Sequence, residues 1–175
     1  MQSFTENFNI LSSLGAIFMA LSALFIILSM LSGKKSHLLN LIHKNILLVG
    51  LKISLVCLVG SLIYSNIIGY PPCVLCWWAR ILIYPQVVLF AVALYKKDRS
   101  VLDYSLVLSG IGIIISGFHY VTEMVGYSPL PCSAAAVSCL SRNVFEFGFV
   151  TIPFMGLSAF VLLFVAILST KFVQK

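Results

Sequence analysis

The feature that most constrains this chain is a series of long stretches that carry almost no charge. No residue between Glu6 and Lys34 is charged, and most of the residues there are apolar. A helix needs roughly 20 predominantly apolar residues to cross a hydrocarbon core about 30 Å thick. Four later stretches also meet this requirement, so we predict five membrane-spanning helices, at residues 10–31, 47–68, 77–95, 104–122 and 150–169.

Composition excludes a soluble domain. Hydrophobic residues make up 61% of the 175 residues and charged residues only 9%, against roughly 25% charged residues in an ordinary soluble domain. A soluble fold of this size could not bury so much apolar surface, so the predicted fold class is an all-α membrane protein. The first span has neither a preceding basic stretch nor a small-residue cleavage signature. We therefore expect an anchor rather than a removed signal peptide.

The basic residues lie mostly on one side of the predicted spans. By the positive-inside rule this side is cytoplasmic, which places the amino terminus outside and the carboxyl terminus inside. Only Arg80 and Arg142 depart from this pattern. The net charge of +6 is therefore a signal of topology and does not indicate nucleic-acid binding. The basic residues predicted to be cytoplasmic are Lys34, Lys35, Lys44, Lys52, Lys96, Lys97, Arg99, Lys171 and Lys175.

Four of the five cysteines fall in the two connections predicted to lie outside. Cys73 and Cys76 form a Cys-x-x-Cys unit, and Cys132 and Cys139 belong to the long connection before the last span. Thiols that face an oxidising compartment form disulfides, so we expect two pairs. Cys57 lies within the second span and is predicted to be a packing residue.

The Cys-x-x-Cys unit has the features of a reactive pair. Pro71 and Pro72 end the preceding span, which places Cys73 near the amino end of the next helix. Free backbone N–H groups at a helix start favour a thiolate. The pair is therefore interpreted as redox-active, while a structural disulfide and half of a metal site remain alternatives.

Arg80 lies four residues after Cys76, one turn further along the same helix face. An Arg within an apolar segment costs roughly 2.5–3.5 kcal/mol unless it is paired or reaches the interface. We predict that it stabilises the Cys76 thiolate and donates hydrogen bonds to a carbonyl oxygen of a membrane-soluble ligand. The alternative is an anchor that reaches lipid phosphates beside Trp77 and Trp78.

His119 lies near the outer end of the fourth span, at a depth similar to that of Arg80. It has two interpretations. It is either a hydrogen-bonded residue at the membrane interface or a second contact of the same ligand.

These motifs resemble the quinone-dependent membrane thiol oxidases of the DsbB type, including the short-loop relatives called BdbC. The resemblance covers residues 44–169. Its most specific part is the sequence Pro-Cys-Val-Leu-Cys at residues 72–76, followed by Arg80.

Two further segments are similar to the same family. The connection that holds Cys132 and Cys139 resembles the second cysteine pair. The sequence Glu-Phe-Gly-Phe-Val-Thr-Ile-Pro at residues 146–153 resembles the start of the last family helix. His119 falls where family members carry a His near the quinone.

The resemblance implies a relay of electrons through catalytic cysteines. In the family, a soluble thiol oxidase of the thioredoxin fold, the DsbA-like partner, gives its electrons to the second pair. By this mapping Cys132 forms the mixed disulfide with the partner, and Cys139 then exchanges with Cys73. Cys76 faces the bound ubiquinone or menaquinone. No metal is implied.

Arg80 and His119 are the quinone-binding residues that the resemblance implies. It also implies a four-helix redox bundle at residues 45–175 in the cytoplasmic (inner) membrane, which sustains disulfide formation in exported proteins. Residues 1–44, an additional transmembrane helix and a cytoplasmic loop, depart from the family pattern. The gap between Cys132 and Cys139 is shorter than in many relatives, which leaves the second pair less freedom to reach the first.

Three other functions fit parts of the pattern. A vitamin K epoxide reductase-like enzyme also couples quinones to thiols, but its Cys-x-x-Cys lies in the last core helix. A membrane metal-binding protein could use the loop thiolates for zinc or copper, although no His or acidic cluster accompanies them in the sequence. A non-catalytic membrane subunit could use disulfides only to link its loops. The predicted function is the membrane thiol oxidase.

Overall fold

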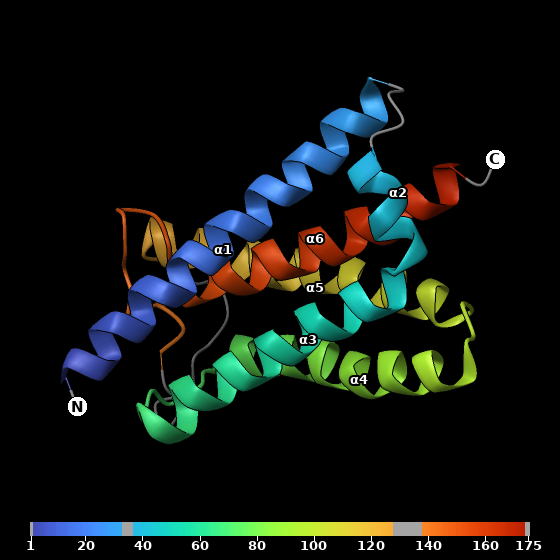
Figure 1. The fold of residues 1–175 in the computed structure, drawn as a ribbon. Coiled ribbons are helices and arrows are strands. Elements are labelled where there is room, and N and C mark those ends of the chain that lie inside the picture. The colour runs from blue at the N-terminus through green and yellow to red at the C-terminus, as the bar shows by residue number, and fades with distance from the viewer. Residues whose placement is uncertain (1, 33–36, 128–137, 174–175) are drawn as a thin grey trace.

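The computed structural model describes residues 2–32, 37–127 and 138–173. These residues form six α-helices and one short π-helix, and they contain no β-strand beyond an isolated bridge between Glu146 and Val150. The all-helical prediction is confirmed. The elements are α1 (Gln2–Leu31), α2 (His37–Lys44), α3 (Ile46–Leu62), η1 (Ile63–Ile67), α4 (Val74–Lys96), α5 (Val101–Val125) and α6 (Ile152–Val173) (Figure 1).

Five helical segments are long and apolar enough to cross a membrane, which confirms the five predicted spans and a multi-pass membrane protein. They begin and end within a few residues of the predicted bounds, except that α1 begins earlier. Two elements were not predicted from the sequence, namely α2 in the first basic connection and the π-helix η1. The spans are Gln2–Leu31, Ile46–Ile67, Val74–Lys96, Val101–Val125 and Ile152–Lys171.

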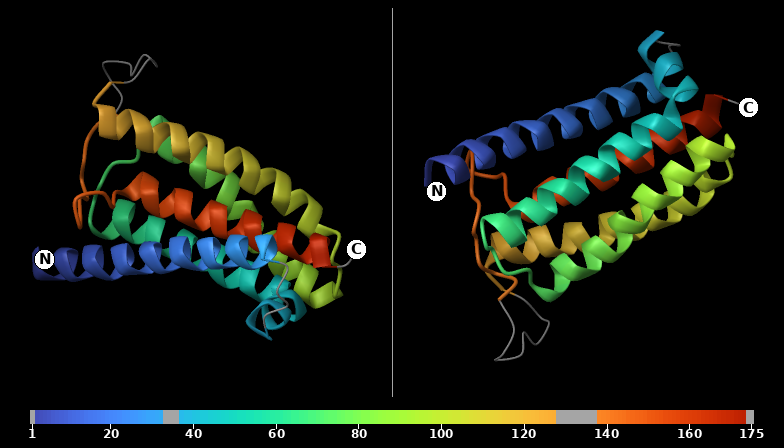
Figure 2. Two further views of the ribbon diagram at one scale, coloured as in Figure 1. Left: turned by 90° about the horizontal axis from the view of Figure 1, so that it is seen from above. Right: turned by 60° about the horizontal axis from the view of Figure 1, so that its bottom comes forward.

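Helix α6 occupies the middle of the bundle. Figure 2 shows α1 and α5 on different sides of α6, and its span is the most deeply buried of the five. α6 packs chiefly against α5 and α1, while α3 packs along α4. The buried side chains of α1 include Ser13, Ala16 and Ala23. Their small size permits the close approach of α1 to α6.

The two ends of the bundle differ in content. The basic end holds α2, the turn between α4 and α5, and the end of α6. There Arg99 donates to the carbonyl of His43 at 3.2 Å, and Lys171 forms an ion pair with Asp103. The cysteine end holds the start of α4 and the connection from residue 138 to residue 151.

The bundle is tightly packed from the level of Phe160, at the inner end of the cavity described below, to the basic end. The rings of Phe90 and Phe160 are fully buried. Each ring covers a glycine of the neighbouring helix, because a Cβ added at Gly50 or Gly112 would lie 2.5 Å from the nearest atom of Phe90 or Phe160, respectively. These two contacts fix the α3–α4 and α5–α6 pairs at short distance.

A polar contact joins α4 to α5 inside this packed half. The fully buried Gln86 accepts a hydrogen bond of 2.5 Å from the Ser105 hydroxyl, and its amide donates to the carbonyl of Leu82 at 3.1 Å. A polar side chain buried between membrane helices needs such partners. Gln86 therefore fixes the pairing of α4 and α5.

Candidate redox site

The Cys-x-x-Cys pair lies at the amino end of α4, as predicted. Cys73 is the N-cap residue with an extended backbone (φ −75°, ψ 174°), and Cys76 belongs to the first helical turn. Pro71 and Pro72 separate α4 from the preceding helical segment. Proline lacks the backbone N–H that would continue the helical hydrogen bonds. The two Sγ atoms lie 3.4 Å apart, so the pair is a hydrogen-bonded dithiol.

Cys73 holds its proton more firmly than an ordinary thiol. The hydrogen bond to Cys76, together with burial, raises the pKa of the Cys73 thiol to about 11. Cys73 therefore remains protonated at neutral pH in the dithiol form. This differs from the expectation that the helix start makes Cys73 a thiolate, because the neighbouring sulfur and the loss of water outweigh the backbone N–H groups.

His119 links the Cys73 thiol to the last connection of the chain. It is buried on α5, and its Nε2 lies 3.6 Å from the Sγ of Cys73 and 3.3 Å from the carbonyl oxygen of Cys139. The Sγ atoms of Cys73 and Cys139 and a ring nitrogen of His119 all lie within 4.8 Å of one another. Three segments far apart in the sequence thus meet at one buried point.

Arg142 fixes the connection that carries Cys139. Its Nε and Nη2 donate to the carbonyl oxygen of Glu123 at 3.3 and 2.9 Å, and Nη2 also donates to that of Met124 at 3.1 Å. These carbonyls belong to the last turn of α5, where backbone acceptors lack helical partners. The guanidinium group therefore caps α5 and holds the connection against it.

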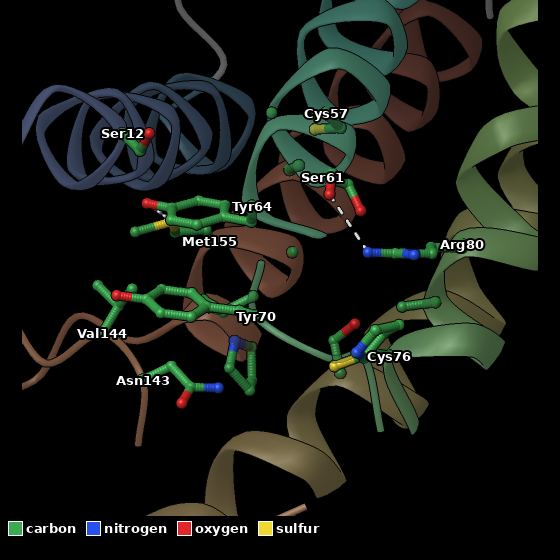
Figure 3. A pocket seen from close by; sticks show the side chains of 18 of the residues that line it. Ser12, Cys57, Ser61, Tyr64, Tyr70, Cys76, Arg80, Asn143, Val144 and Met155 are labelled. Atoms are coloured by element: carbon green, nitrogen blue, oxygen red, sulfur yellow. Dashed lines mark hydrogen bonds between the residues drawn. The ribbon is translucent and has the colours of Figure 1, made fainter. Parts of the chain in front are cut away.

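Arg80 points into the space between α4 and α3 (Figure 3). Its Nη2 donates to the carbonyl oxygen of Ser61 at 3.2 Å, and its guanidinium lies 5.4 Å from the centre of the Trp77 ring. The hydroxyl of Ser65 donates to the same carbonyl at 3.1 Å. The regular helix gives way to the π-helix η1 just after this point, where the hydrogen-bonding register of the backbone changes.

A cavity of about 650 Å³ connects these side chains. Small-molecule sites typically have volumes of about 300–1,000 Å³, with apolar walls and a few polar groups. Cys73, Cys76, Arg80, His119 and Cys139 all contribute to the wall. α6 supplies another part of the wall through Ile152, Pro153, Met155, Gly156, Ala159 and Phe160.

The structure therefore brings together five of the six predicted site residues. The sixth, Cys132, lies outside the described residues. Cys57 also borders the cavity and is partly buried against the core, in agreement with a packing role.

One buried acid of the cavity wall was missed in the sequence. Glu123 lies one turn after His119 on α5 and is only 3% exposed. Its Oε2 has no hydrogen-bond partner within the described part of the chain. The four-residue spacing from His119 was the available signal, since residues four apart share a helix face. A carboxyl group at this position can hold or release a proton beside the cavity.

The cluster of Cys73, His119 and Cys139 also has the ligand types of a soft-metal site. Thiolate and imidazole ligands suit zinc or copper. The sequence alone showed no His beside the cysteines, because His119 reaches them only through the fold.

Comparison with known proteins identifies the family. The family model described as "Disulfide bond formation protein DsbB" matches residues 43–170. Disulfide bond formation protein C of Bacillus subtilis is 39% identical over 114 residues, which cover 65% of this chain and 83% of the relative. A probable disulfide formation protein of Oceanobacillus iheyensis is 42% identical over 125 residues, covering 70% and 86%, respectively.

A third relative, the probable disulfide formation protein C 1 of Bacillus anthracis, is 41% identical over 109 residues, covering 62% of this chain and 78% of its own length. No solved structure matches the chain. The family match includes every cysteine of the chain and begins after α1. The chain therefore belongs to the DsbB family of membrane proteins of disulfide bond formation.

Proposed function

We propose that the protein is a membrane thiol oxidase that takes electrons from a soluble thioredoxin-fold partner and passes them to a quinone. The observation that carries this proposal is the meeting of Cys139, His119 and Cys73 at the wall of a cavity that also contains Cys76 and Arg80. These residues connect the thiol of Cys139, in the last connection, to the apolar cavity. The expected electron acceptor is ubiquinone or menaquinone.

The first part of the proposed relay uses the second cysteine pair. A thiolate of the partner attacks the sulfur of Cys132, the bond to Cys139 breaks, and Cys139 leaves as a thiolate. The second thiolate of the partner then displaces Cys132, so the partner is oxidised and the second pair is reduced.

The second part transfers the electrons to the first pair. The Cys139 thiolate attacks Cys73 of the oxidised pair, and Cys76 leaves as a thiolate. Cys132 then attacks Cys139, which restores the second disulfide and frees Cys73. The close approach of the Cys73 and Cys139 sulfurs, within 4.8 Å, supports this order. His119 Nε2, 3.6 Å from Cys73, is placed to accept and return the proton of that thiol.

The cavity fits a quinone in size and chemistry. Its wall is mainly apolar and includes one cationic donor, Arg80, which uses only part of its N–H groups on Ser61. A quinone bound there would accept two electrons and two protons as Cys73 and Cys76 close to a disulfide. Arg80 would orient a quinone oxygen near Cys76, and His119 would form the opposite polar wall.

The proposal includes an arrangement in the membrane. We infer that residues 45–175 form the redox bundle, that residues 1–44 are an addition, and that the cysteine end faces the outside of the cytoplasmic (inner) membrane. The basic residues between the spans support this orientation. Impermeant amine reagents should leave Lys96 and Lys97 unlabelled in sealed cells. Labelling of either lysine from outside would reverse the orientation.

The decisive experiment uses purified protein, a reduced thioredoxin-fold thiol oxidase and a soluble quinone, with quinone absorbance followed over time. We expect quinone loss to require both proteins. In Cys139→Ser, Cys132 is a free thiol, so the trapping experiment uses the oxidised partner. The Cys132 thiolate should attack the disulfide of the partner, and the mixed disulfide should accumulate on Cys132 because the loop has no second thiol to release it. Non-reducing electrophoresis and peptide mapping would detect it. An adduct on Cys73 or Cys76 would mean that the partner bypasses the second pair.

The ligand cluster favours one second candidate, a metal-binding protein that uses Cys73, His119 and Cys139. Thiol alkylation of the reduced protein distinguishes the two functions. Quinone should protect the thiols by reoxidising them, and the protection should be reversed by reductant. Protection by Zn²⁺ without reoxidation by quinone would favour the metal site. Disulfides that resist graded reductant would instead indicate a purely structural role.

A further inference from the structure

The cavity extends beyond the part of the chain that matches the DsbB family. One of its walls belongs to α1, which contributes Phe8, Leu11, Ser12, Gly15 and Met19. The family match begins at residue 43, after α1 has ended. The added helix is therefore part of the site and not only an anchor beside it.

Specific contacts hold α1 in this position. Its small buried residues pack toward α6, and the ring of Phe8 meets the ring of Tyr64 edge-on at 5.0 Å. Tyr64 stacks in turn on Tyr70 at 6.1 Å. Figure 3 shows Ser12 above Tyr64, with Tyr70 beneath it. The three aromatic side chains belong to the wall of the cavity beside α1.

Exposed apolar residues of both α1 and α3 line the cavity, which indicates a sideways opening between these two helices. Among the described residues, α1 packs chiefly against α6 and not along α3. The facing wall of α3 includes Val56 and Val59, which are 65% and 45% exposed. In a membrane this exposed apolar surface faces lipid chains, so the opening leads from the bilayer to the redox pair.

A glycine lies on each side of the opening. Gly15 of α1 and Gly60 of α3 both line the cavity, and a Cβ added at either would meet no atom within 4 Å. The absence of side chains at both positions leaves a slot between two apolar walls. The apolar walls suit a hydrocarbon chain.

We propose that α1 forms one side of a lateral opening that holds the prenyl chain of the quinone, so that this helix takes part in quinone binding. The inference rests on the proposed function, because it assumes that a quinone occupies the cavity. The head group would lie near Cys76 and Arg80, and the prenyl chain would leave between Leu11 and Gly15 on α1 and Val56 and Gly60 on α3.

The test narrows the slot from each side. Gly15→Leu and Gly60→Leu add bulk to opposite walls, and leucine is a better helix former than glycine, so both variants should fold. Leu14→Phe adds bulk to α1 at a position that is 51% exposed and does not line the cavity. It controls for a general effect on α1.

The readout is equilibrium binding measured by quenching of the two tryptophans, one of which, Trp77, lies against Arg80. We expect Gly15→Leu and Gly60→Leu each to raise the Kd for a prenylated quinone by about tenfold or more. The Kd for a quinone without a prenyl chain should change less, and Leu14→Phe should bind both quinones as the unmodified protein does.

The outcomes separate the inference from the proposed function. Weakened binding in Gly60→Leu with unchanged binding in Gly15→Leu would overturn the role of α1 and leave the quinone site intact. Unchanged binding in both variants would overturn the lateral opening and leave the quinone site intact. The proposed function itself would fail if the unmodified protein bound neither quinone. Equal weakening for prenylated and unprenylated quinones would overturn the assignment of the prenyl chain to this opening.

Discussion

Glycine has different roles in the two halves of the bundle. Toward the basic end, Gly50 and Gly112 lie directly beneath the buried rings of Phe90 and Phe160. Toward the cysteine end, Gly15 and Gly60 face open space. Glycine in a membrane helix thus serves either the close approach of a neighbouring helix or the space for a ligand, and only the facing element decides which.

The two halves also differ in whether their buried polar side chains have hydrogen-bond partners. In the packed half Gln86 and Ser105 satisfy one another. Around the cavity, the buried Ser116 Oγ and Glu123 Oε2 have no hydrogen-bond partner among the described residues. Unsatisfied buried polar atoms are costly, so a structure that retains them near a cavity reserves them for a ligand or a proton. We therefore expect the packed half to contribute most of the stability. We expect the half that contains the cavity, called the hollow half below, to contain the reacting groups.

The largest expected effect separates chemistry from stability. Cys76→Ser should lower the rate of quinone reduction at least about 10³-fold, because a disulfide cannot form without the second sulfur. Its melting temperature should stay close to that of the unmodified protein, since serine is nearly isosteric. Quinone absorbance and thermal unfolding in detergent measure the two quantities. A large loss of stability would mean that the hollow half also supports the fold.

The next effect concerns the reactivity of Cys73. Because its pKa is raised to about 11, the reactive thiolate should be scarce at neutral pH. Alkylation at pH 8 should be about 100-fold slower than in the denatured protein and should rise about tenfold per pH unit up to about pH 11.

Mass spectrometry after timed alkylation of the reduced protein measures this rate. Cys76→Ser is the matched control, because it replaces the sulfur that hydrogen-bonds Cys73 and should speed the labelling. Rapid alkylation of Cys73 at pH 7 in the unmodified protein would show that Cys73 is the thiolate of the pair.

The third effect concerns Arg80. Arg80→Met should raise the KM for quinone roughly tenfold or more, since a hydrogen bond from a charged group contributes about 1.5–3 kcal/mol. Arg80→Lys should recover only part of this loss, because lysine keeps the charge but lacks the planar arrangement of donors. Steady-state kinetics at saturating partner measure it. Unchanged kinetics in both variants would leave Arg80 with only its contacts to Ser61 and Trp77.

The smallest effect tests the two kinds of glycine directly. Gly112→Ala should destabilise the protein by about 1–3 kcal/mol, because the added Cβ would lie 2.5 Å from the Phe160 ring. Gly60→Ala should be neutral or slightly stabilising, because its Cβ meets no atom within 4 Å. Unfolding curves in detergent compare them. Equal destabilisation of both variants would contradict the division of the bundle into a packed and a hollow half.

The spans could be predicted from the sequence because hydrocarbon thickness sets their length and charges mark their ends. The approach of Cys73, Cys76 and Arg80 could also be predicted, since a single helix fixes their spacing. The contacts between different helices could not be predicted from the sequence. Glu123 joins the site through the rotation of α5. The apolar residues of α1 are distributed around the whole helix, so no pattern indicates which face lines a cavity.

The reactivity of Cys73 was equally out of reach of the sequence. The helix start alone favours a thiolate, and the opposite result depends on the 3.4 Å approach of Cys76 and on burial. The Cys-x-x-Cys motif therefore identifies a reactive pair. The burial and hydrogen bonds of each sulfur decide how readily it loses its proton.

The anchor that Arg142 provides has a kinetic consequence. Cys139 lies three residues before Arg142, so while the guanidinium stays bound to the end of α5, the chain lets Cys139 travel only about 10 Å. A group confined to so small a volume meets Cys73 at an effective concentration in the millimolar range or above. In the proposed relay, exchange between the two loops would then proceed at a rate independent of how many copies the membrane holds. Dissolved small thiols at lower concentration compete poorly with it for Cys73.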